Sequence, residues 1–331
     1  MALNFNGFFG AQLNDEPQEI DLDAPKKAKM KKSPLMRFSD KAASLNISNE
    51  FCLVSELHTL MGGYDADRPY TRLHASDVTD QDNEFCPRER GLLITTKAER
   101  NSRFISTETR TYFDVGEAYH DLIREKWGLR VSLGDWKCLS CDHVHEAMKK
   151  PNSCHNCGRH YFEYQEQRVR SKTTAISCGI DWQIDSQKLK QPTIVEIKSM
   201  AADEFKKLVS PFAEHRIRTK LYLYAINDAA HPEKVEHLNK DSAIIVYVSK
   251  GAPVEEEGES YVCGAGFEEK KTPFKVFLIE RDDAEIQPYL DKGIELKKYL
   301  NGGKLPERIC KTPKDPRATN CKMCDLCWRK T

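Results

Sequence analysis

The chain has 331 residues, of which 39% are hydrophobic, and its 51 basic and 51 acidic residues give a formal net charge of zero. A chain of this length can bury one good core with small appendages, and the balanced charge argues against a protein that coats nucleic acid nonspecifically. The sequence contains no run of eighteen apolar residues and no recognisable signal peptide. We therefore expect a cytoplasmic protein without a membrane partner.

The first fifty residues differ from the rest. An acidic stretch at 15–23 is followed by five lysines in the seven positions 26–32, and no sustained apolar period appears. Residues 1–50 are predicted to form a disordered tail. Residues 51–135 are predicted to be the N-terminal helical part of the main domain. Helices are expected at 50–61, 74–97 and 104–127, of which the second contains Cys86 and the third contains His120.

A metal-binding pattern follows in residues 136–161. Cys138 and Cys141 form one C-x2-C pair, Cys154 and Cys157 form a second, and Gly158 is placed for the second turn. Four thiolates at this spacing satisfy tetrahedral Zn2+, so we predict a zinc ribbon that is inserted in the main domain and projects from it. Such a module could contact DNA or protein, or be purely structural. The histidines around the pairs are expected to be surface residues: His143, His145, His155 and His160.

Residues 162–300 alternate between strand-like and helix-like patterns. Strands are predicted at 165–170, 174–184, 193–199, 243–249 and 274–279. Helices are predicted at 202–209, 211–227 and 284–300, and an exposed loop at 251–266. Strands interrupted by helices indicate an α/β core with a mixed central sheet flanked by helices. The phosphate-binding loop of an ATPase motor does not occur in the sequence.

Two of these strands carry the candidate catalytic residues. Asp181 follows Gly179-Ile180, and Glu196-Ile197-Lys198 lies on the next strand. The carboxylates could hold Mg2+ or Mn2+, with the backbone carbonyl of Ile197 as a further ligand, and Lys198 could orient and help deprotonate an attacking water. The set predicts a metal-dependent phosphodiesterase centre whose catalytic residues are Asp181, Glu196 and Lys198.

Two predicted helices add side chains to this centre. In the helix at 104–127, His120 lies on the same face as Gly116 and Ile123, which makes it a candidate third metal ligand. In the helix at 211–227, Arg218 and Tyr222 are one turn apart, so both could reach one phosphate of DNA.

In this order the motifs resemble those of the PD-(D/E)xK nuclease superfamily, and within it the RecB-like exonuclease group that includes AddB and the CRISPR-associated iron–sulfur adaptation nucleases. The resemblance covers about residues 74–328. Arginine stands at position 218 where the family has glutamine, which suggests a stronger phosphate contact. The resemblance implies a restriction-endonuclease-like core. The family's G-x-x-x-H helix, G-x-D strand, E-x-K strand and Q-x-x-x-Y helix match Gly116 to His120, Gly179 to Asp181, Glu196 to Lys198, and Arg218 to Tyr222.

The same resemblance implies an iron–sulfur cluster that staples the termini of the core. Iron–sulfur members of the group have one cysteine before the core, often in a C-P-R context, and three after it, the last two separated by five residues. Cys86 has that context, and Cys321 and Cys327 have that separation. A [4Fe-4S] cluster is therefore expected on Cys86, Cys310, Cys321 and Cys327, with Cys324 as the alternate ligand, and residues 301–331 form a cysteine-rich cluster segment. The other interpretation is a structural Zn2+ on Cys310, Cys321, Cys324 and Cys327.

The resemblance further implies a DNA exonuclease of bacterial or viral origin. Its expected substrates are single-stranded DNA or DNA ends, in recombination, repair, replication or CRISPR-type processing. It would act alone or beside a helicase or recombination partner. The alternative is a noncatalytic nucleic-acid-binding protein, or a subunit of a helicase–nuclease complex.

Overall fold

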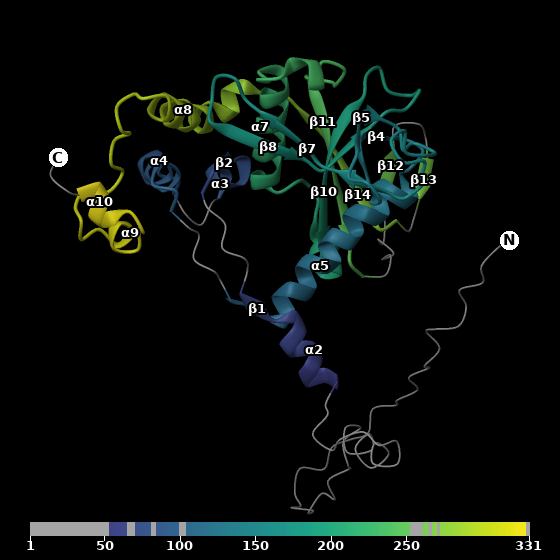
Figure 1. Cartoon of the computed structure of the whole chain (residues 1–331), viewed down its shortest axis with the longest axis horizontal. Coiled ribbons are helices and arrows are strands. Elements are labelled where there is room, and N and C mark those ends of the chain that lie inside the picture. The colour runs from purple at the N-terminus through teal and green to yellow at the C-terminus, as the bar shows by residue number, and fades with distance from the viewer. Residues whose placement is uncertain are drawn as a thin grey trace, which may run out of the picture. The chain divides into compact units, whose positions relative to one another are not determined.

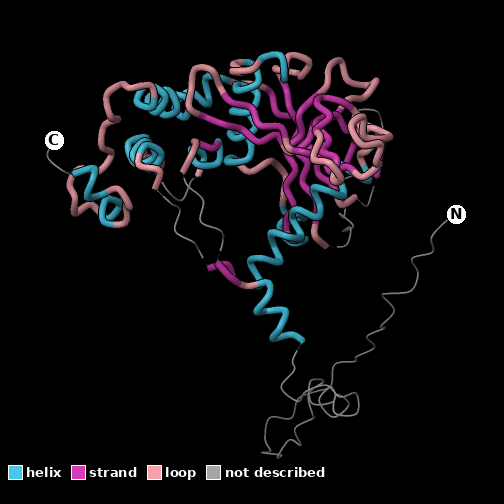
Figure 2. The backbone as a smooth tube through the Cα atoms, in the orientation of Figure 1, coloured by secondary structure: helices cyan, strands magenta, loops and turns pink. Residues whose placement is uncertain are grey.

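The computed structural model describes residues 53–64, 70–80, 84–98, 104–251, 261–263, 267–269 and 272–328. The predicted tail of residues 1–50 lies outside the described residues. The chain divides into two units, residues 1–57 and 58–331, and of the first only the start of α2 (Leu53–Met61) is described. The fold and the sites below belong to the second unit, whose elements are drawn in Figures 1 and 2.

A seven-stranded mixed sheet forms the centre of this unit (Figure 1). β10 and β11 are parallel, whereas the other described pairs in this sheet are antiparallel. The prediction of an α/β fold with a mixed sheet flanked by helices is confirmed. The strand order is β14 (Phe274–Glu280), β11 (Ser242–Ser249), β10 (Thr193–Met200), β9 (Trp182–Ile184), β4 (Ser132–Cys138) and β5 (Val144–Met148), and β6 (Phe162–Gln165) also pairs with β4.

A second, three-stranded sheet has the order β2 (Leu73–His74), β8 (Ile176–Ile180) and β7 (Gln167–Arg170). The sequence predicts one strand over 174–184, but the structure has two, because the chain changes partners at Asp181. β8 pairs with β7 and β2, whereas β9 pairs with β10 and β4. In the same way, Glu166 separates β6 of the central sheet from β7. Two carboxylates therefore lie where the chain passes from one sheet to the other.

Alternate residues of the central strands pack into different cores. On β11, Ile245 and Tyr247 belong to a core that includes α6 (Ala202–Lys207), whereas Val246 and Val248 belong to another. This alternation follows from the two-residue period of a strand, which sends neighbouring side chains to opposite faces. The sheet is thus covered on both faces, as the apolar character of β11 predicts.

The largest core surrounds α7 (Ala213–Asn227). Leu221 and Leu223 of this helix are buried with residues of α3 (Ala75–Thr79), β8 and α8 (Asp283–Leu300). Burial of such side chains from water is the main favourable term in folding. The core therefore fixes α7 against β8, next to Asp181.

The remaining described elements are short or more exposed. The helix predicted at 74–97 is instead two helices, α3 and α4: the backbone leaves the helical region at Asp80, and Pro87 takes the first position of α4. The prediction of a loop over 251–266 is wrong at Tyr261–Cys263. These residues form strand β12, which pairs with β13, and tyrosine and valine favour strands. None of the described helices is both long enough and apolar enough to cross a membrane. The bounds are β1 (Gly63–Tyr64), α4 (Pro87–Thr95), β3 (Phe104–Ile105), α5 (Thr107–Asp121), a π-helical turn (Leu122–Trp127), a 3-10 turn (Pro232–Lys234), β12 (Tyr261–Cys263), β13 (Phe267–Glu269), α9 (Pro316–Thr319) and α10 (Cys324–Trp328).

The segment with the C-x2-C pairs is continuous with the central sheet through β4. Ser132 and Leu133 pair with β9, and residues further along β4 pair with β5 and β6. Trp136, at 0% exposure, belongs to the same core as Trp182 and Ile197. The segment therefore extends the sheet and shares its core, instead of projecting from the domain as the sequence predicts.

Candidate active site and metal centres

Glu166 and Asp181 are brought together by the pairing of β7 with β8. Gln167 lies opposite Ile180 in this antiparallel register, so Glu166 and Asp181 become neighbours at the end of the ladder. His120 approaches from the last turn of α5. One ligand atom from each of His120, Glu166 and Asp181 lies within 4.8 Å of the others, which makes the three a candidate metal-binding group.

Lys198 links the two carboxylates that the sequence singles out. Its Nζ lies 2.5 Å from Oε1 of Glu196 and 3.8 Å from Oδ2 of Asp181. The backbone amide of Ile197 donates to Oδ2 of Asp181 at 2.9 Å. The structure thus brings Asp181, Glu196 and Lys198 together beside His120. The contact seen for Ile197 is made by its amide, and the role of its carbonyl as a ligand stays a prediction.

Burial and mutual charge shift the pKa of each of these groups. Burial and the nearby Asp181 raise the pKa of Glu196. Burial acts in the same direction on Asp181, but the charges of Lys198 and His120 outweigh it and hold that pKa below its ordinary value. For Lys198, burial is outweighed by Glu196 and Asp181, so its pKa is raised. Burial lowers the pKa of His120, which favours the neutral imidazole that metals bind.

The residues present fit a divalent cation. Glu196 is 2% exposed, and its Oε2 is buried without a hydrogen-bond partner among the described residues. A buried carboxylate oxygen is costly unless a cation or a donor binds it. Carboxylate oxygens, together with one imidazole, are a ligand set that suits Mg2+ or Mn2+.

Glu166 and Arg124 are candidates that the sequence analysis does not identify. Arg124 is buried and donates to Oε1 of Glu166 at 3.2 Å, to the carbonyl of Asp181 at 3.1 Å and to Oδ1 of Asp121 at 2.9 Å. Its planar guanidinium therefore holds the two sheet junctions together. The position of Arg124 one helical turn after His120 is a sequence signal that could identify it. Glu166 has no comparable signal beyond its place between two strand-like segments.

Arg218 and Tyr222 of α7 lie beside the carboxylates. Nη1 of Arg218 is 4.0 Å from Oε1 of Glu196, and Nη2 contacts Glu214. Tyr222 is buried, and its pKa is raised by this burial and by the charges of Glu196 and Asp181, so the hydroxyl keeps its proton. Both residues are at the site, and their contact with phosphate stays a prediction.

The cysteines of the two C-x2-C pairs form a compact set. Sγ of Cys138 lies 3.6 Å from that of Cys157, Sγ of Cys141 lies 3.6 Å from that of Cys154, and all four sulfurs lie within 4.8 Å of one another. Four sulfurs bound to one tetrahedral zinc ion would be about 3.8 Å apart. By its geometry, the set could hold one metal ion, and the distances between its sulfurs suit zinc.

Each C-x2-C turn is closed by a residue with positive φ. Asp142, with φ 58°, follows the first pair, and Gly158, with φ 72°, follows the second. The amide of Asp142 donates to the carbonyl of Cys138 at 2.9 Å, and that of Gly158 to the carbonyl of Cys154 at 2.8 Å. A Cβ at Gly158 would have no atom within 4 Å, so crowding does not explain why glycine is found here. The left-handed backbone conformation does.

The expectation that the nearby histidines are surface residues is wrong for His145. Its exposure is 4%, and its ring packs edge-on against the rings of His143, His155 and Phe162. On β5 the side chains of Val144 and His145 alternate between exposed and buried positions, which places the imidazole inward. His145 is therefore a packing residue of the segment that carries the C-x2-C pairs.

The other predicted ligand cysteines surround one small cavity. Cys86 at the start of α4 lines it together with Cys310, Cys321, Cys324 and Cys327. None of the close groups of ligand atoms found among the described residues contains three of these sulfurs, whereas the four sulfurs of the C-x2-C pairs form one such group. Cys310 and Cys324, the two alternatives for one ligand, both reach the cavity.

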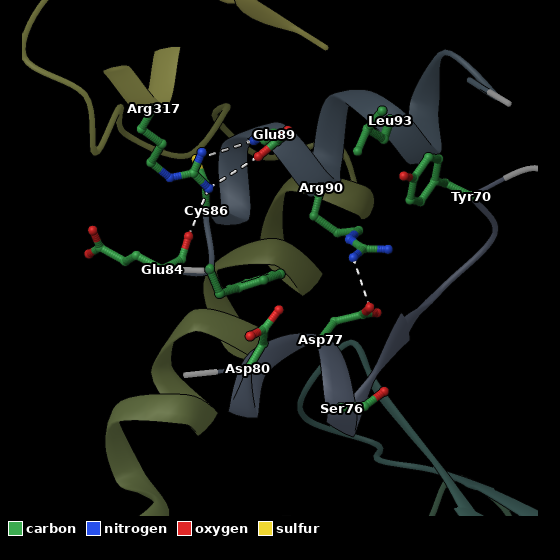
Figure 3. Close-up of a pocket in the computed structure, with 11 residues that line it drawn as sticks. Tyr70, Ser76, Asp77, Asp80, Glu84, Cys86, Glu89, Arg90, Leu93 and Arg317 are labelled. Carbon is green, nitrogen blue, oxygen red and sulfur yellow. Dashed lines mark hydrogen bonds and ion pairs between the residues drawn. The ribbon is translucent and has the colours of Figure 1, made fainter. Parts of the chain in front are cut away.

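Arg317 ties the segment of Cys86 to the C-terminal segment. Its Nη2 donates to the carbonyl of Glu84 at 2.8 Å and to Oε2 of Glu89 at 3.1 Å. Figure 3 shows these contacts next to Cys86, at the edge of a second cavity of about 210 Å³. The two segments of the unit that carry these cysteines are thus held together by protein contacts.

No protein-family model matches the sequence, and no curated protein matches it. Among solved structures, the chain is similar to the crystal structure of LHK-Exo in complex with dAMP, with 11% sequence identity and a TM-score of 0.39. The superposition covers 70% of this chain and 89% of that chain. A similarity of this size assigns neither a fold family nor a function.

Proposed function

We propose that this protein is a metal-dependent deoxyribonuclease of the PD-(D/E)xK type. The observation that carries the proposal is the meeting of Asp181, Glu196 and Lys198, in which both carboxylates lie within 3.8 Å of one amine. Two further observations would not be needed for a purely structural ion pair. Oε2 of Glu196 is buried without a partner among the described residues, and His120, Glu166 and Asp181 lie close enough together to bind one metal ion. Perturbed, buried titratable groups of this kind are typical of functional sites.

Each residue of the site has a role in this proposal. His120, Glu166 and Asp181 would hold Mg2+ or Mn2+, with Glu196 and the carbonyl of Ile197 as further ligands. The bound cation would supply Lewis acidity to the phosphodiester and lower the pKa of the attacking water. Arg124 keeps the ligand-bearing junctions in place, and Arg218 and Tyr222 would bind a phosphate of the substrate.

Lys198 would orient the attacking water and stabilise negative charge on the phosphate. Its raised pKa keeps the amine protonated while Glu196 and Asp181 are its partners. A protonated amine can donate to the water and to a nonbridging phosphate oxygen. Lys198 could accept the proton of the water, as the sequence predicts, only after it had lost one of these carboxylate contacts and its own proton.

The order of the sequence motifs supports DNA as the substrate, either single-stranded or with a free end. We propose exonuclease action in recombination, repair, replication or CRISPR-type processing. The same motifs support an intracellular protein of a bacterium or virus that works alone or beside a helicase or recombination partner.

Two further metal centres belong to the proposal. Zn2+ would be held by Cys138, Cys141, Cys154 and Cys157, and a [4Fe-4S] cluster by Cys86, Cys310, Cys321 and Cys327, with Cys324 as the alternate. The C-P-R context of Cys86 and the spacing of Cys321 and Cys327 favour the cluster over a single zinc ion. Anaerobically purified protein should be brown and contain about one zinc and about four irons per chain. Colourless protein that contains zinc but no iron would exclude the cluster.

The activity is tested with end-labelled single- and double-stranded DNA in Mg2+, Mn2+ or EDTA. We expect metal-dependent degradation that is lost in Asp181→Ala and Lys198→Ala, and the product ladder then gives the polarity. Lys188→Ala, which changes an exposed lysine outside the site, is the matched control and should degrade DNA like the wild type. DNA that stays intact with metal and is only shifted on a native gel would replace the proposal with the noncatalytic binding protein.

A further inference from the structure

Three arginines of the small sheet have no oppositely charged partner in the described part of the chain. Arg168 and Arg170 lie on β7 and are exposed, and Arg72 directly precedes β2 on the other side of β8. Their side chains form no hydrogen bond or ion pair with the described residues. Arg168 and Arg170 also line a cavity of about 330 Å³ together with Lys234. These guanidinium groups are therefore available to an anion.

The pleat of the sheet places the arginines of β7 on the same face as two candidate metal ligands. Side chains two residues apart on a strand lie on the same face of the sheet, so those of Arg168 and Arg170 lie on the same face as that of Glu166. Arg168 lies opposite Gly179, which is two residues before Asp181. A Cβ built at Gly179 would lie 3.9 Å from Oε2 of Glu166, which places that carboxylate over the same face. The face thus leads from the proposed metal centre to the arginines.

Arg72 joins this face from the other side of β8. His74 of β2 lies beside Ser177 in a parallel register, and Arg72 is two residues before His74. The pKa of Arg72 is lowered by burial and then by repulsion from Arg168 and Arg170, as expected for three cations gathered on one face. An arginine nevertheless keeps its charge at physiological pH.

Ser177 contributes a buried hydroxyl to the middle of the face. It lies directly opposite Arg170, it is 3% exposed, and its Oγ has no hydrogen-bond partner among the described residues. A buried polar atom without a partner is uncommon in folded proteins and is often explained by a bound water or ion. The hydroxyl thus lies on β8, the strand between β2 and the two arginines of β7.

The carboxylates at the two ends of β7 are already engaged. Glu166 is bound by Arg124, and Asp228 accepts hydrogen bonds from the hydroxyls of Ser171 and Thr173 at 2.6 Å. Neither forms an ion pair with the arginines of the face. Within the described part of the chain, neither of these carboxylates therefore cancels the positive charge of the face.

We propose that this arginine face, formed by Arg72, Arg168, Arg170 and Ser177, binds successive phosphates of one DNA strand next to the metal centre. Side chains two residues apart on a strand are about 7 Å apart, which is comparable to the separation of neighbouring phosphates in an extended single strand. Guanidinium groups bind phosphate through two parallel hydrogen bonds. The path of the strand into the centre rests on the proposed nuclease function, whereas phosphate binding by the face can be measured without catalysis.

The test compares two double variants that remove the same charge. Arg168→Gln/Arg170→Gln changes the face, and Lys188→Gln/Lys190→Gln changes two exposed lysines between β9 and β10. Binding of a fluorescent single-stranded oligonucleotide is measured by anisotropy in EDTA over a series of salt concentrations. We expect the arginine variant to bind about tenfold more weakly, with a slope of log K against log salt that is shallower by about 1.4, since each lost phosphate contact removes about 0.7.

Further variants guard against an effect on folding. Arg168→Lys/Arg170→Lys keeps both charges and should have nearly the wild-type slope of log K against log salt. Arg72→Gln alone should make this slope shallower by about 0.7. Thermal unfolding should be the same for all variants, since the arginines make no hydrogen bond or ion pair with the residues that the structure describes. Equal affinity and equal salt slope for the arginine and lysine double variants would overturn the inference, as would a wild-type protein that does not bind the oligonucleotide.

A separate assay distinguishes binding from chemistry. The arginine variant should hydrolyse bis(p-nitrophenyl) phosphate, a diester too short to reach the face, at the rate of the wild type in Mn2+. If neither protein hydrolyses it while their DNA affinities still differ, the nuclease proposal fails and the phosphate-binding face stands.

Discussion

Nε of Arg88 donates a hydrogen bond to Sγ of Cys327 at 3.1 Å, although the two are 239 positions apart in the sequence. The same guanidinium donates to the carbonyl of Pro306 at 2.8 Å. One planar group, anchored next to Cys86 on α4, therefore holds the C-terminal cysteine segment in place.

Arg88→Ala is expected to release this segment first. Loss of charge-assisted hydrogen bonds should lower the free energy of unfolding by about 1–3 kcal/mol. Hydrogen exchange measured by mass spectrometry should accelerate in residues 306–328 more than elsewhere. Lys311→Ala, at an exposed position of the same segment, is the control. Unchanged exchange in this segment would show that Arg88 does not hold it.

Glu166→Gln is expected to weaken Mn2+ binding by about tenfold or more. A neutral amide oxygen is a poorer ligand for a hard cation than a carboxylate oxygen. Calorimetric titration without DNA measures the affinity, and the Mn2+ dependence of cleavage should shift by a similar factor. Glu163→Gln, at an exposed position of β6, should change neither. Equal Mn2+ affinities for Glu166→Gln and the wild type would exclude Glu166 as a ligand.

His215 is expected to make the protein sensitive to acid. Its Nδ1 lies 2.8 Å from the hydroxyl of Tyr247, and the pKa of His215 is lowered to about 3 by burial and then by the charges of Lys198 and Arg218. An unfolded chain binds a proton at this residue below about pH 6.5, whereas the folded protein does so only near pH 3. Acid therefore favours the unfolded state throughout this window, and stability rises with pH across it.

His215→Asn removes this titration and should flatten the pH dependence of stability. Between about pH 6.5 and pH 4.5, the fall in the free energy of unfolding should become less steep by up to about 1.4 kcal/mol per pH unit. Urea unfolding at several pH values measures it. His231→Asn, at an exposed histidine, is the control. Identical pH profiles for His215→Asn and the wild type would contradict the prediction.

Gly128→Ala should destabilise the junction between the His120 helix and the central sheet. A Cβ there would lie 2.6 Å from Cη2 of Trp182 and 2.7 Å from the carbonyl of Ile123. Trp182 cannot easily move, because its Nε1 donates to Oγ of Ser132 at 2.8 Å. We expect a loss of about 1–3 kcal/mol in urea unfolding.

Gly116→Ala is the matched control for that change. Its Cβ would lie 3.4 Å from Oγ of Ser199, an ordinary contact, and alanine favours a helix over glycine by about 0.5–1 kcal/mol. Stability should therefore be unchanged or higher. If both alanine variants were equally stable, crowding at Gly128 would be disproved.

Cys154→Ser should abolish the proposed metal binding at the C-x2-C pairs and destabilise the sheet as well. Cys154 is buried in the same core as Trp136 and Trp182, so the effect should extend beyond the ribbon. We expect loss of about one zinc per chain, a lower Tm and a shifted tryptophan emission. Cys178→Ser, at a buried cysteine outside the set, should keep its zinc. A full zinc content in Cys154→Ser would contradict the assignment.

The sequence by itself determined the features whose signal is local. The C-x2-C pairs and Gly158 identify a compact thiolate set, because a turn that holds one metal needs ligands at a fixed short spacing. The apolar period of residues 211–227 predicts α7, and the neighbouring strand patterns place Asp181 and Glu196 on segments able to pair. These interpretations depend on residues close together in the chain.

Only the tertiary structure decided which strands pair, and this choice creates the rest of the site. The chain changes sheets at Glu166 and at Asp181, which turns two strand-like segments into four strands and makes the two carboxylates neighbours. It also sets Arg168 on their side of the sheet and joins the segment of the C-x2-C pairs to the central core. Register depends on the partner available in space, and a shift of one residue would reverse every side chain, so a pattern along one segment does not record it.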